Sequence, residues 1–140
     1  MSDESAEEKL MDAPTAEGAD WLLQNLILAA KAGVEMPVTL TVTGVAISGF
    51  IVSGQRYLDL LNDQYSGLGT QDGKDFGQYM LEYKDALLLD DAEGAGPYYI
   101  HLRDAAYVSG AAQLPGARGM IWRGKVGDVS GFSLGAIKLN

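Results

Sequence analysis

Residues 119–135 read GMIWRGKVGDVSGFSLG, and the pattern of this stretch decides the fold. Apolar and small residues are interleaved in it without the spacing of a helix, which is typical of β-structure. Its glycines indicate strands that bend sharply or that allow another backbone to come close. Arg123 follows two apolar residues and precedes Gly124, which is free to adopt a positive φ. We therefore expect a bent β-ribbon onto which the upstream elements pack.

Two upstream segments have the alternation of strands. Residues 37–52 alternate valine, leucine and isoleucine with smaller or polar residues, and Gly44 and Gly49 interrupt them. This pattern predicts two strands that are joined at Gly44 and strongly bent, which is how small barrels close. Residues 98–108, YYIHLRDAAYV, form the third strand region, with Asp104 suited to a following turn. One face of this strand carries Ile100 and Leu102, and the other carries Tyr99, His101 and Arg103.

The remaining segments have helical spacing or loop composition. Residues 21–32, WLLQNLILAAKA, form a helix that Asp20 caps and Gly33 ends. Because apolar residues occupy most of its surface, we expect this helix to be covered on more than one side, over an open barrel end or in a subunit interface. The other assignments are a helix over 57–64, a loop over 65–74, a helix over 76–90 broken only by Gly77, loops over 91–97 and 109–117, and a last strand segment over 136–139.

This order of segments is typical of an α+β domain with a small, strongly bent antiparallel sheet, SH3-like or Sm-like in outline. Residues 19–140 form this single domain, with an N-terminal helix and a mainly helical insertion at about residues 57–97. Residues 1–18 are acidic, small and polar, and we expect them to form a disordered tail.

Composition and charge exclude several function classes. The chain of 140 residues has no cysteine and one histidine, which rules out disulfides, thiolate catalysis and multi-histidine metal sites. The net charge of −9 disfavours free nucleic acid as a partner, although residues 98–140 carry five bases against two acids and can meet an acidic partner. The apolar residues 21–32 follow an acidic segment and are too few to span a membrane, so we expect a cytoplasmic protein.

The inventory of catalytic groups is thin. No Gly-rich phosphate loop of the Walker type is present. His101 could act with Ser109 and Asp104, but no nucleophile elbow or oxyanion sequence frames them, and a hydrogen-bonded structural histidine is the favoured interpretation. Arg123 either forms an ion pair within the protein or at an interface, which is favoured, or binds a ligand carboxylate.

We expect no metal and no cofactor. The acidic residues Asp90, Asp91 and Glu93 lack the spacing of known cation ligands and are typical of an acidic loop. With no catalytic constellation either, the favoured hypothesis is a protein that is not an enzyme.

Aromatic and basic residues of the last third form the expected interaction site. Strands of a small sheet place half of their side chains outward, so some of Tyr98, Tyr99, Trp122 and Phe132 must be exposed or covered by a partner. Strand edges rich in glycine favour the assembly of copies into a homo-oligomer. The residues expected at such an interface are Tyr99, His101, Trp122, Arg123, Lys125 and Phe132.

Several of these motifs resemble the gas vesicle accessory protein family GvpU. The segments that carry the resemblance are Leu40–Ser53 (LTVTGVAISGFIVS), Tyr57, Tyr99–Leu102 (YIHL), and residues 119–135 with their Trp-Arg-Gly-Lys-Val core. The resemblance spans about residues 21–137 and leaves the acidic tail uncovered. It implies an accessory protein linked to vesicle clustering, with the gas vesicle shell or other accessory proteins as partners. No catalytic residues transfer with it.

A second resemblance is to Sm-like proteins. Residues 40–51 resemble the first motif of that family, residues 100–106 its third strand, and Ile121–Gly124 the Arg-Gly of its second motif. This implies a bent five-stranded barrel with an N-terminal helix, often assembled in rings through edge strands. The Asp and Asn of the family's RNA pocket are not found after Ile51, so RNA binding is not implied. The alternative function is an Sm-like ring that binds RNA or a small ligand.

Overall fold

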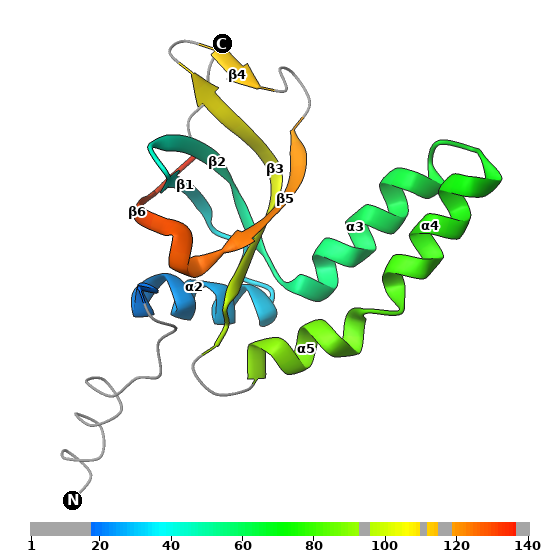
Figure 1. Cartoon of the computed structure of the whole chain (residues 1–140), viewed down its shortest axis with the longest axis horizontal. Helices are drawn as coiled ribbons and strands as arrows, with labels where there is room; N and C mark the ends of the chain where they lie inside the picture. The colour runs from blue at the N-terminus through cyan, green and yellow to red at the C-terminus, as the bar shows by residue number, and fades with distance from the viewer. Residues whose placement is uncertain (1–17, 93–95, 110–111, 115–118, 137–140) are drawn as a thin grey trace, which may run out of the picture.

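The computed structural model describes residues 18–92, 96–109, 112–114 and 119–136. It shows an antiparallel sheet with one helix packed against it (Figure 1). Residues 54–92 form three further helices at the side of the sheet, which we call the helical arm. The elements in chain order are α2 (Trp21–Lys31), β1 (Pro37–Val42), β2 (Val45–Val52), α3 (Gly54–Ser66), α4 (Gln71–Leu81), α5 (Lys84–Ala92), β3 (Tyr99–Ser109), β4 (Ala112–Leu114), β5 (Met120–Lys125), the 3-10 turn η1 (Val126–Asp128) and β6 (Val129–Leu134). Of the disordered tail predicted over residues 1–18, residues 1–17 lie outside the described residues.

The strands form one sheet in the order β4-β3-β2-β1-β6, and β5 also pairs with β3. All of the pairings are antiparallel. The bent ribbon predicted over residues 119–135 is confirmed, because β5 and β6 are separated only by the turn η1. The bend predicted at Gly49 is confirmed as well, since the register of β2 and β3 shifts between Ser48 and Phe50.

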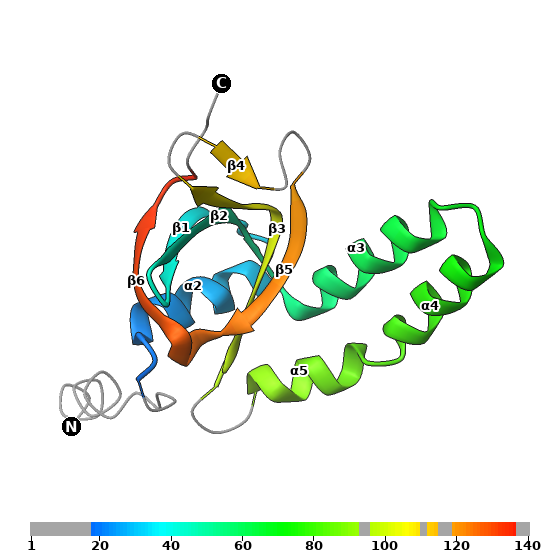
Figure 2. The ribbon, with the colours of Figure 1, turned by 45° about the horizontal axis from the view of Figure 1, so that its top comes forward.

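The sheet curves round but its described pairings do not close it. Figure 2 shows β5 and β6 as the two sides of one curved corner. Among the described strands, β5 pairs with β3 and β6 pairs with β1, and no pairing joins β5 to β6. The fold is therefore α+β with a strongly bent antiparallel sheet.

The strand predicted over residues 98–108 is confirmed as β3, but Asp104 does not form the expected turn. Asp104 lies within the strand, where it takes a φ of 50° as part of an irregularity in the pairing with β5. Short polar side chains tolerate this left-handed conformation better than most others. The loop predicted over 109–117 contains the short strand β4. The predicted strand segment over 136–139 lies outside the described residues except for Ala136, which is not in a strand.

The core lies between α2 and the concave side of the sheet. Helix α2 begins at the predicted cap, where the backbone N–H of Leu22 donates to Asp20 Oδ1 at 2.8 Å. Its inner face buries Leu23 and Ile27, and its outer face leaves Trp21 and Leu22 exposed, so the described residues cover it on one side only. The buried core cluster comprises Leu23, Ile27, Ala30, Val38, Leu40, Ile47, Ile51, Ile100, Leu102, Ala105, Val126 and Val129.

The insertion is helical, as predicted, but its boundaries differ. Helix α3 begins at Gly54 rather than at residue 57, because the Ser53 hydroxyl accepts the backbone N–H of Arg56 at 3.1 Å. The loop predicted over 65–74 is short, since Thr70 caps α4 by accepting from the backbone N–H of Gly73 at 3.0 Å. The helix predicted over 76–90 is two helices, α4 and α5, which are separated after Leu81 and not at Gly77.

The glycines of α4 pack against α3, which explains why the helix is not broken at Gly77 as predicted. Helices α3 and α4 form a hairpin that projects away from the sheet in both views (Figures 1 and 2). A Cβ at Gly73 would overlap the carbonyl oxygen of Tyr65, and a Cβ at Gly77 would overlap the side chain of Asn62. Gly73 and Gly77 therefore face α3 and allow the two helices to approach closely.

Replacing Gly73 by alanine is expected to open this hairpin. The overlap falls on backbone and costs about 1–3 kcal/mol, which exceeds the gain of about 1 kcal/mol in helix propensity. Amide hydrogen exchange should speed up in α3 and α4 while the sheet stays protected. Gln78→Ala on the exposed side of α4 is the matched control and should slow exchange or leave it unchanged. Slower exchange in Gly73→Ala would contradict the packing seen here.

Candidate functional site

Three of the predicted interaction residues meet on the outer face of β3 and β5. His101 and Arg123 are opposite each other in the register of the two strands. Arg123 Nε donates a hydrogen bond to His101 Nε2 at 3.1 Å. The Arg123 guanidinium also lies 3.8 Å from the centre of the Tyr99 ring, a cation–π contact. These contacts fix the orientation of Arg123 with partners that carry no negative charge.

His101 is buried although it points away from the core. Helix α3 covers it, with the Tyr57 ring centre 4.7 Å from the imidazole centre, and only 2% of the residue is exposed. Helix α3 can start so close because its first residue is Gly54, where a Cβ would stand 3.3 Å from the imidazole. Burial and the nearby Arg123 cation lower the pKa of His101 to about 3, so the ring is neutral near pH 7. Because Nε2 accepts from Arg123, the ring proton is on Nδ1.

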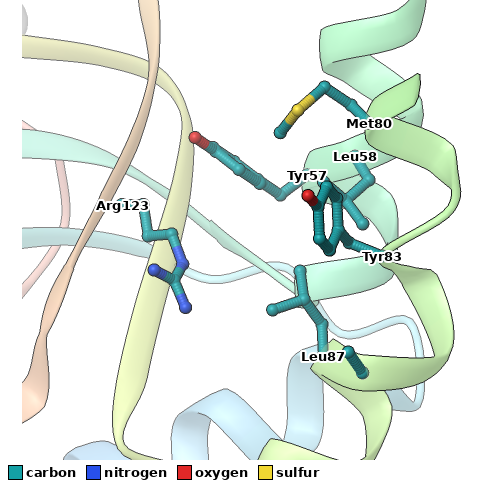
Figure 3. A pocket seen from close by; sticks show the side chains of 7 residues that line it. Tyr57, Leu58, Met80, Tyr83, Leu87 and Arg123 are labelled. Atoms are coloured by element: carbon teal, nitrogen blue, oxygen red, sulfur yellow. The ribbon is translucent and has the colours of Figure 1, made fainter. Parts of the chain in front are cut away.

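A pocket opens beside this group, between the sheet and the helical arm. Its volume is about 250 Å³. Figure 3 shows Arg123 on the sheet side and the other labelled side chains on the helical side. Burial raises the pKa of the Tyr57 phenol, and the Arg123 cation opposes that rise. The lining residues are Tyr57, Leu58, Met80, Tyr83, Ala86, Leu87 and Arg123.

For some of these pocket residues, the sequence predicted a shared helix face but not a site. Met80, Tyr83 and Leu87 have the spacing of one helix face, which could be seen in advance. The pattern does not reveal that this face turns toward Arg123, because α4 and α5 form separate helices. Tyr57 and Leu58 were predicted to be helical but were not predicted to line a site.

A second charged cluster ties the arm to the sheet. Glu35, in the segment between α2 and β1, forms ion pairs with Arg56 of α3 and with Arg103 of β3. Arg103 also pairs with Asp104 at 2.6 Å and lies 4.3 Å from the centre of the Phe50 ring. Because these side chains satisfy one another, the cluster is a structural link between three elements.

Of the other predicted interaction residues, Trp122 and Phe132 lie apart from Tyr99, His101 and Arg123. Trp122 lies on the opposite face of β5, where it packs against the core, and its Nε1 donates to Tyr107 Oη at 3.0 Å. Phe132 is paired with Leu40 across β1 and β6 and is half-buried. Trp122 and Phe132 are each partly buried, so only part of either side chain faces solvent, and their place at an interface stays a prediction. Lys125 is exposed at the end of β5, opposite Tyr99.

Trp122→Ala is expected to destabilise the fold by about 2 kcal/mol. The indole packs on the core and covers Gly124, where a Cβ would overlap its ring, so truncation leaves a cavity at the sheet surface. Urea unfolding followed by circular dichroism measures the loss, with Lys125→Ala on the same strand as the control. A change below about 0.5 kcal/mol, together with lost self-association, would show that Trp122 acts at an interface and not in packing.

His101 is not placed as a catalytic group. The Asp104 carboxylate pairs with Arg103, and His101 Nε2 is occupied by Arg123. With its pKa lowered to about 3, the imidazole stays neutral near pH 7 and does not act as a general acid there. Within the described ranges, no group of three or more histidine, aspartate or glutamate side chains is placed to hold a metal ion. Glu93 of the acidic cluster lies outside the described residues, as do the side chains of Asp90 and Asp91.

Comparison of the sequence with models of known protein families gives a match. The profile of the family described as gas vesicle protein GvpU-like matches residues 20–137. The chain belongs to the GvpU-like gas vesicle protein family. The match confirms the resemblance drawn from the strand motifs, and it includes the insertion, so the arm and the pocket lie inside the GvpU-like region. No curated protein and no solved structure matches the chain. None of the described helices is long and apolar enough to cross a membrane.

Proposed function

We propose that this GvpU-like protein is a non-enzymatic accessory protein that self-associates and modulates the assembly or clustering of gas vesicles in the cytoplasm. Family membership over residues 20–137 is the observation that carries the proposal. The buried, neutral state of His101 supports the non-enzymatic part, since it removes the one histidine of the chain from acid–base work.

Features of the sheet and of α2 support self-association. Among the described strands, β5 and β6 each have one edge without a strand partner, and such edges accept a strand from another chain. Leu134 on β6 is 61% exposed, and α2 exposes Trp21, Leu22 and Leu28. These apolar side chains suit contacts between copies, or with the vesicle shell or other accessory proteins.

The net negative charge of the chain predicts how self-association depends on salt concentration. The net charge of −9 makes copies repel each other at low ionic strength. Screening should therefore promote association as sodium chloride rises from about 0.01 M to about 0.15 M. Analytical ultracentrifugation of the full chain measures this change. An assembly that dissociates over the same range would mean that attraction between opposite charges, and not apolar contact, holds the copies together.

Clustering can be tested directly with purified vesicles. Microscopy and light scattering should show larger particles when the protein is added, and a variant with Leu134→Lys on the β6 edge should cluster them less. Ser133→Lys, one residue earlier on the same strand, also adds a cation to an exposed position and serves as the control. Vesicles that stay dispersed at every protein concentration would refute a clustering role.

The competing hypothesis is an Sm-like ring that binds RNA or a small ligand. Binding of RNA needs a basic surface on the protein. Arg123 and Lys125 are the obvious cations of the ribbon, and two cations in a chain of net charge −9 make a weak basic surface. A gel shift with oligo-U at low salt should show no complex. A salt-sensitive complex would favour the ring instead.

A further inference from the structure

The pocket between the helical arm and the sheet is lined by the positively charged guanidinium of Arg123, and no described carboxylate neutralises it. The described ion pairs are formed by other side chains, and Arg123 takes part in none of them. Its Nε group is used by His101, and its ring contact is with Tyr99. A guanidinium has five N–H donors, so those on its two terminal nitrogens are available to a ligand that enters the pocket.

The partners of Arg123 hold it in place and preserve its charge. A carboxylate opposite Arg123 on β3 would neutralise the guanidinium, whereas the buried imidazole of His101 accepts one hydrogen bond and stays neutral. The Tyr99 ring restricts the guanidinium plane. An arginine that is fixed before binding loses little conformational freedom when an anion arrives. This arrangement differs from the Glu35 cluster, where each arginine already has a carboxylate.

The other walls of the pocket are apolar with two phenols. Leu58, Met80 and Leu87 supply aliphatic and thioether surface, and Tyr57 and Tyr83 supply ring surface with a hydroxyl (Figure 3). The volume of about 250 Å³ is at the small end for ligand sites, so it suits one compact apolar group and not an extended chain. A single fixed cation at one side of such a pocket selects an anion that carries an apolar body.

We infer that this pocket binds a compact apolar carboxylate, with the carboxylate on the terminal nitrogens of Arg123 and the apolar group between Met80 and Leu87. A free small acid and the C-terminal residue of another chain with an apolar side chain present this same chemistry. The ligand bridges the sheet and the arm, because Arg123 belongs to β5 while Met80 and Leu87 belong to α4 and α5. Binding therefore stabilises the position of the arm against the sheet.

The test is a titration of the full chain with N-acetyl-leucine and with its amide, followed by NMR shifts of the methionine methyl groups. We expect saturable binding of the acid at least about tenfold tighter than that of the amide, because charged hydrogen bonds contribute more than neutral ones. Arg123→Gln should remove this preference. Lys74→Gln, which removes an exposed cation of the arm outside the pocket, should keep it.

A second variant tests the pocket without disturbing Arg123. Ala86 lines the pocket from the surface of α5, so Ala86→Phe fills the space with little effect on folding, and it should weaken binding of the acid at least about tenfold. Unchanged affinity in this variant would place the ligand elsewhere and overturn the proposal. Absence of saturable binding up to about 10 mM, or equal affinity for acid and amide, would overturn it as well.

Peptides distinguish the two sources of the ligand. A peptide that ends in leucine with a free carboxylate, and the same peptide with an amidated end, are titrated in the same way. Binding of the free-ended peptide with the affinity of N-acetyl-leucine supports the proposal and assigns a chain end as ligand. Binding of the small acid alone supports it and assigns a free metabolite-sized acid.

Discussion

Lowering the pH from about 8 to about 5 is expected to destabilise the protein by about 2 kcal/mol through His101 alone. The ordinary pKa of histidine, 6.5, falls to about 3 in the folded protein, because the ring is buried and faces the Arg123 cation. In the pH range between these two values the unfolded chain binds a proton that the folded protein does not bind. Stability is therefore greatest above pH 6.5 and declines as the pH falls toward 3.

Urea unfolding at a series of pH values measures this effect. The chain has one histidine, so His101→Gln removes the whole imidazole contribution, and any pH dependence that remains belongs to other groups. The charged and titratable groups that face His101 are Arg123 on β5 and the Tyr57 phenol on α3. Equal pH slopes for the parent and His101→Gln over this range would contradict the buried neutral imidazole.

Leu102→Ala is expected to cost about 3 kcal/mol, a large fraction of the stability of a small domain. Leu102 is completely buried in β3, between Ile51 of β2 and Trp122 of β5, so truncation leaves a cavity where two strand pairings meet. Leu134→Ala is the matched control, because that leucine is 61% exposed on β6. The control should change the free energy of unfolding by less than about 0.5 kcal/mol.

Denaturant unfolding monitored by tryptophan fluorescence and by circular dichroism measures both variants. A loss of less than about 1 kcal/mol for Leu102→Ala would mean that β3 is not the centre of the core. Similar losses for the two leucines would contradict the assignment of inside and outside on this sheet.

The strands were predictable because their side chains alternate. In β1, Val38 and Leu40 are buried while Thr39 is partly buried and Thr41 is exposed, so burial in this strand follows the period of two that the sequence displays. The cap at Asp20 could be recognised in the same way, because capping depends on a local hydrogen bond.

The arm was less predictable, since its form depends on contacts between helices. Gly77 looked like a helix breaker, but its missing side chain permits close approach to Asn62, a residue distant in the pattern. The division between α4 and α5 after Leu81 has no equally clear signal in the sequence. Asp104 likewise reads as a turn residue, although pairing on both sides of β3 keeps the strand going.

The candidate site was predicted in part for the same reason. Tyr99, His101 and Arg123 share the outer face of two paired strands, which the alternation of β3 anticipates for the first two. The contact of His101 with Tyr57 depends on how the helical arm packs on the sheet, because it is a tertiary contact between α3 and β3. Sequence periodicity carries no information about it.

The most direct test of the gas vesicle role is flotation of intact vesicles mixed with the purified full-length chain. Vesicles rise on slow centrifugation, and a bound protein rises with them. We predict that this protein is recovered in the floating layer in proportion to the vesicles added, while an unrelated protein of similar size and net charge stays below. Recovery of the protein only in the lower phase, at concentrations where it is folded, would contradict the account.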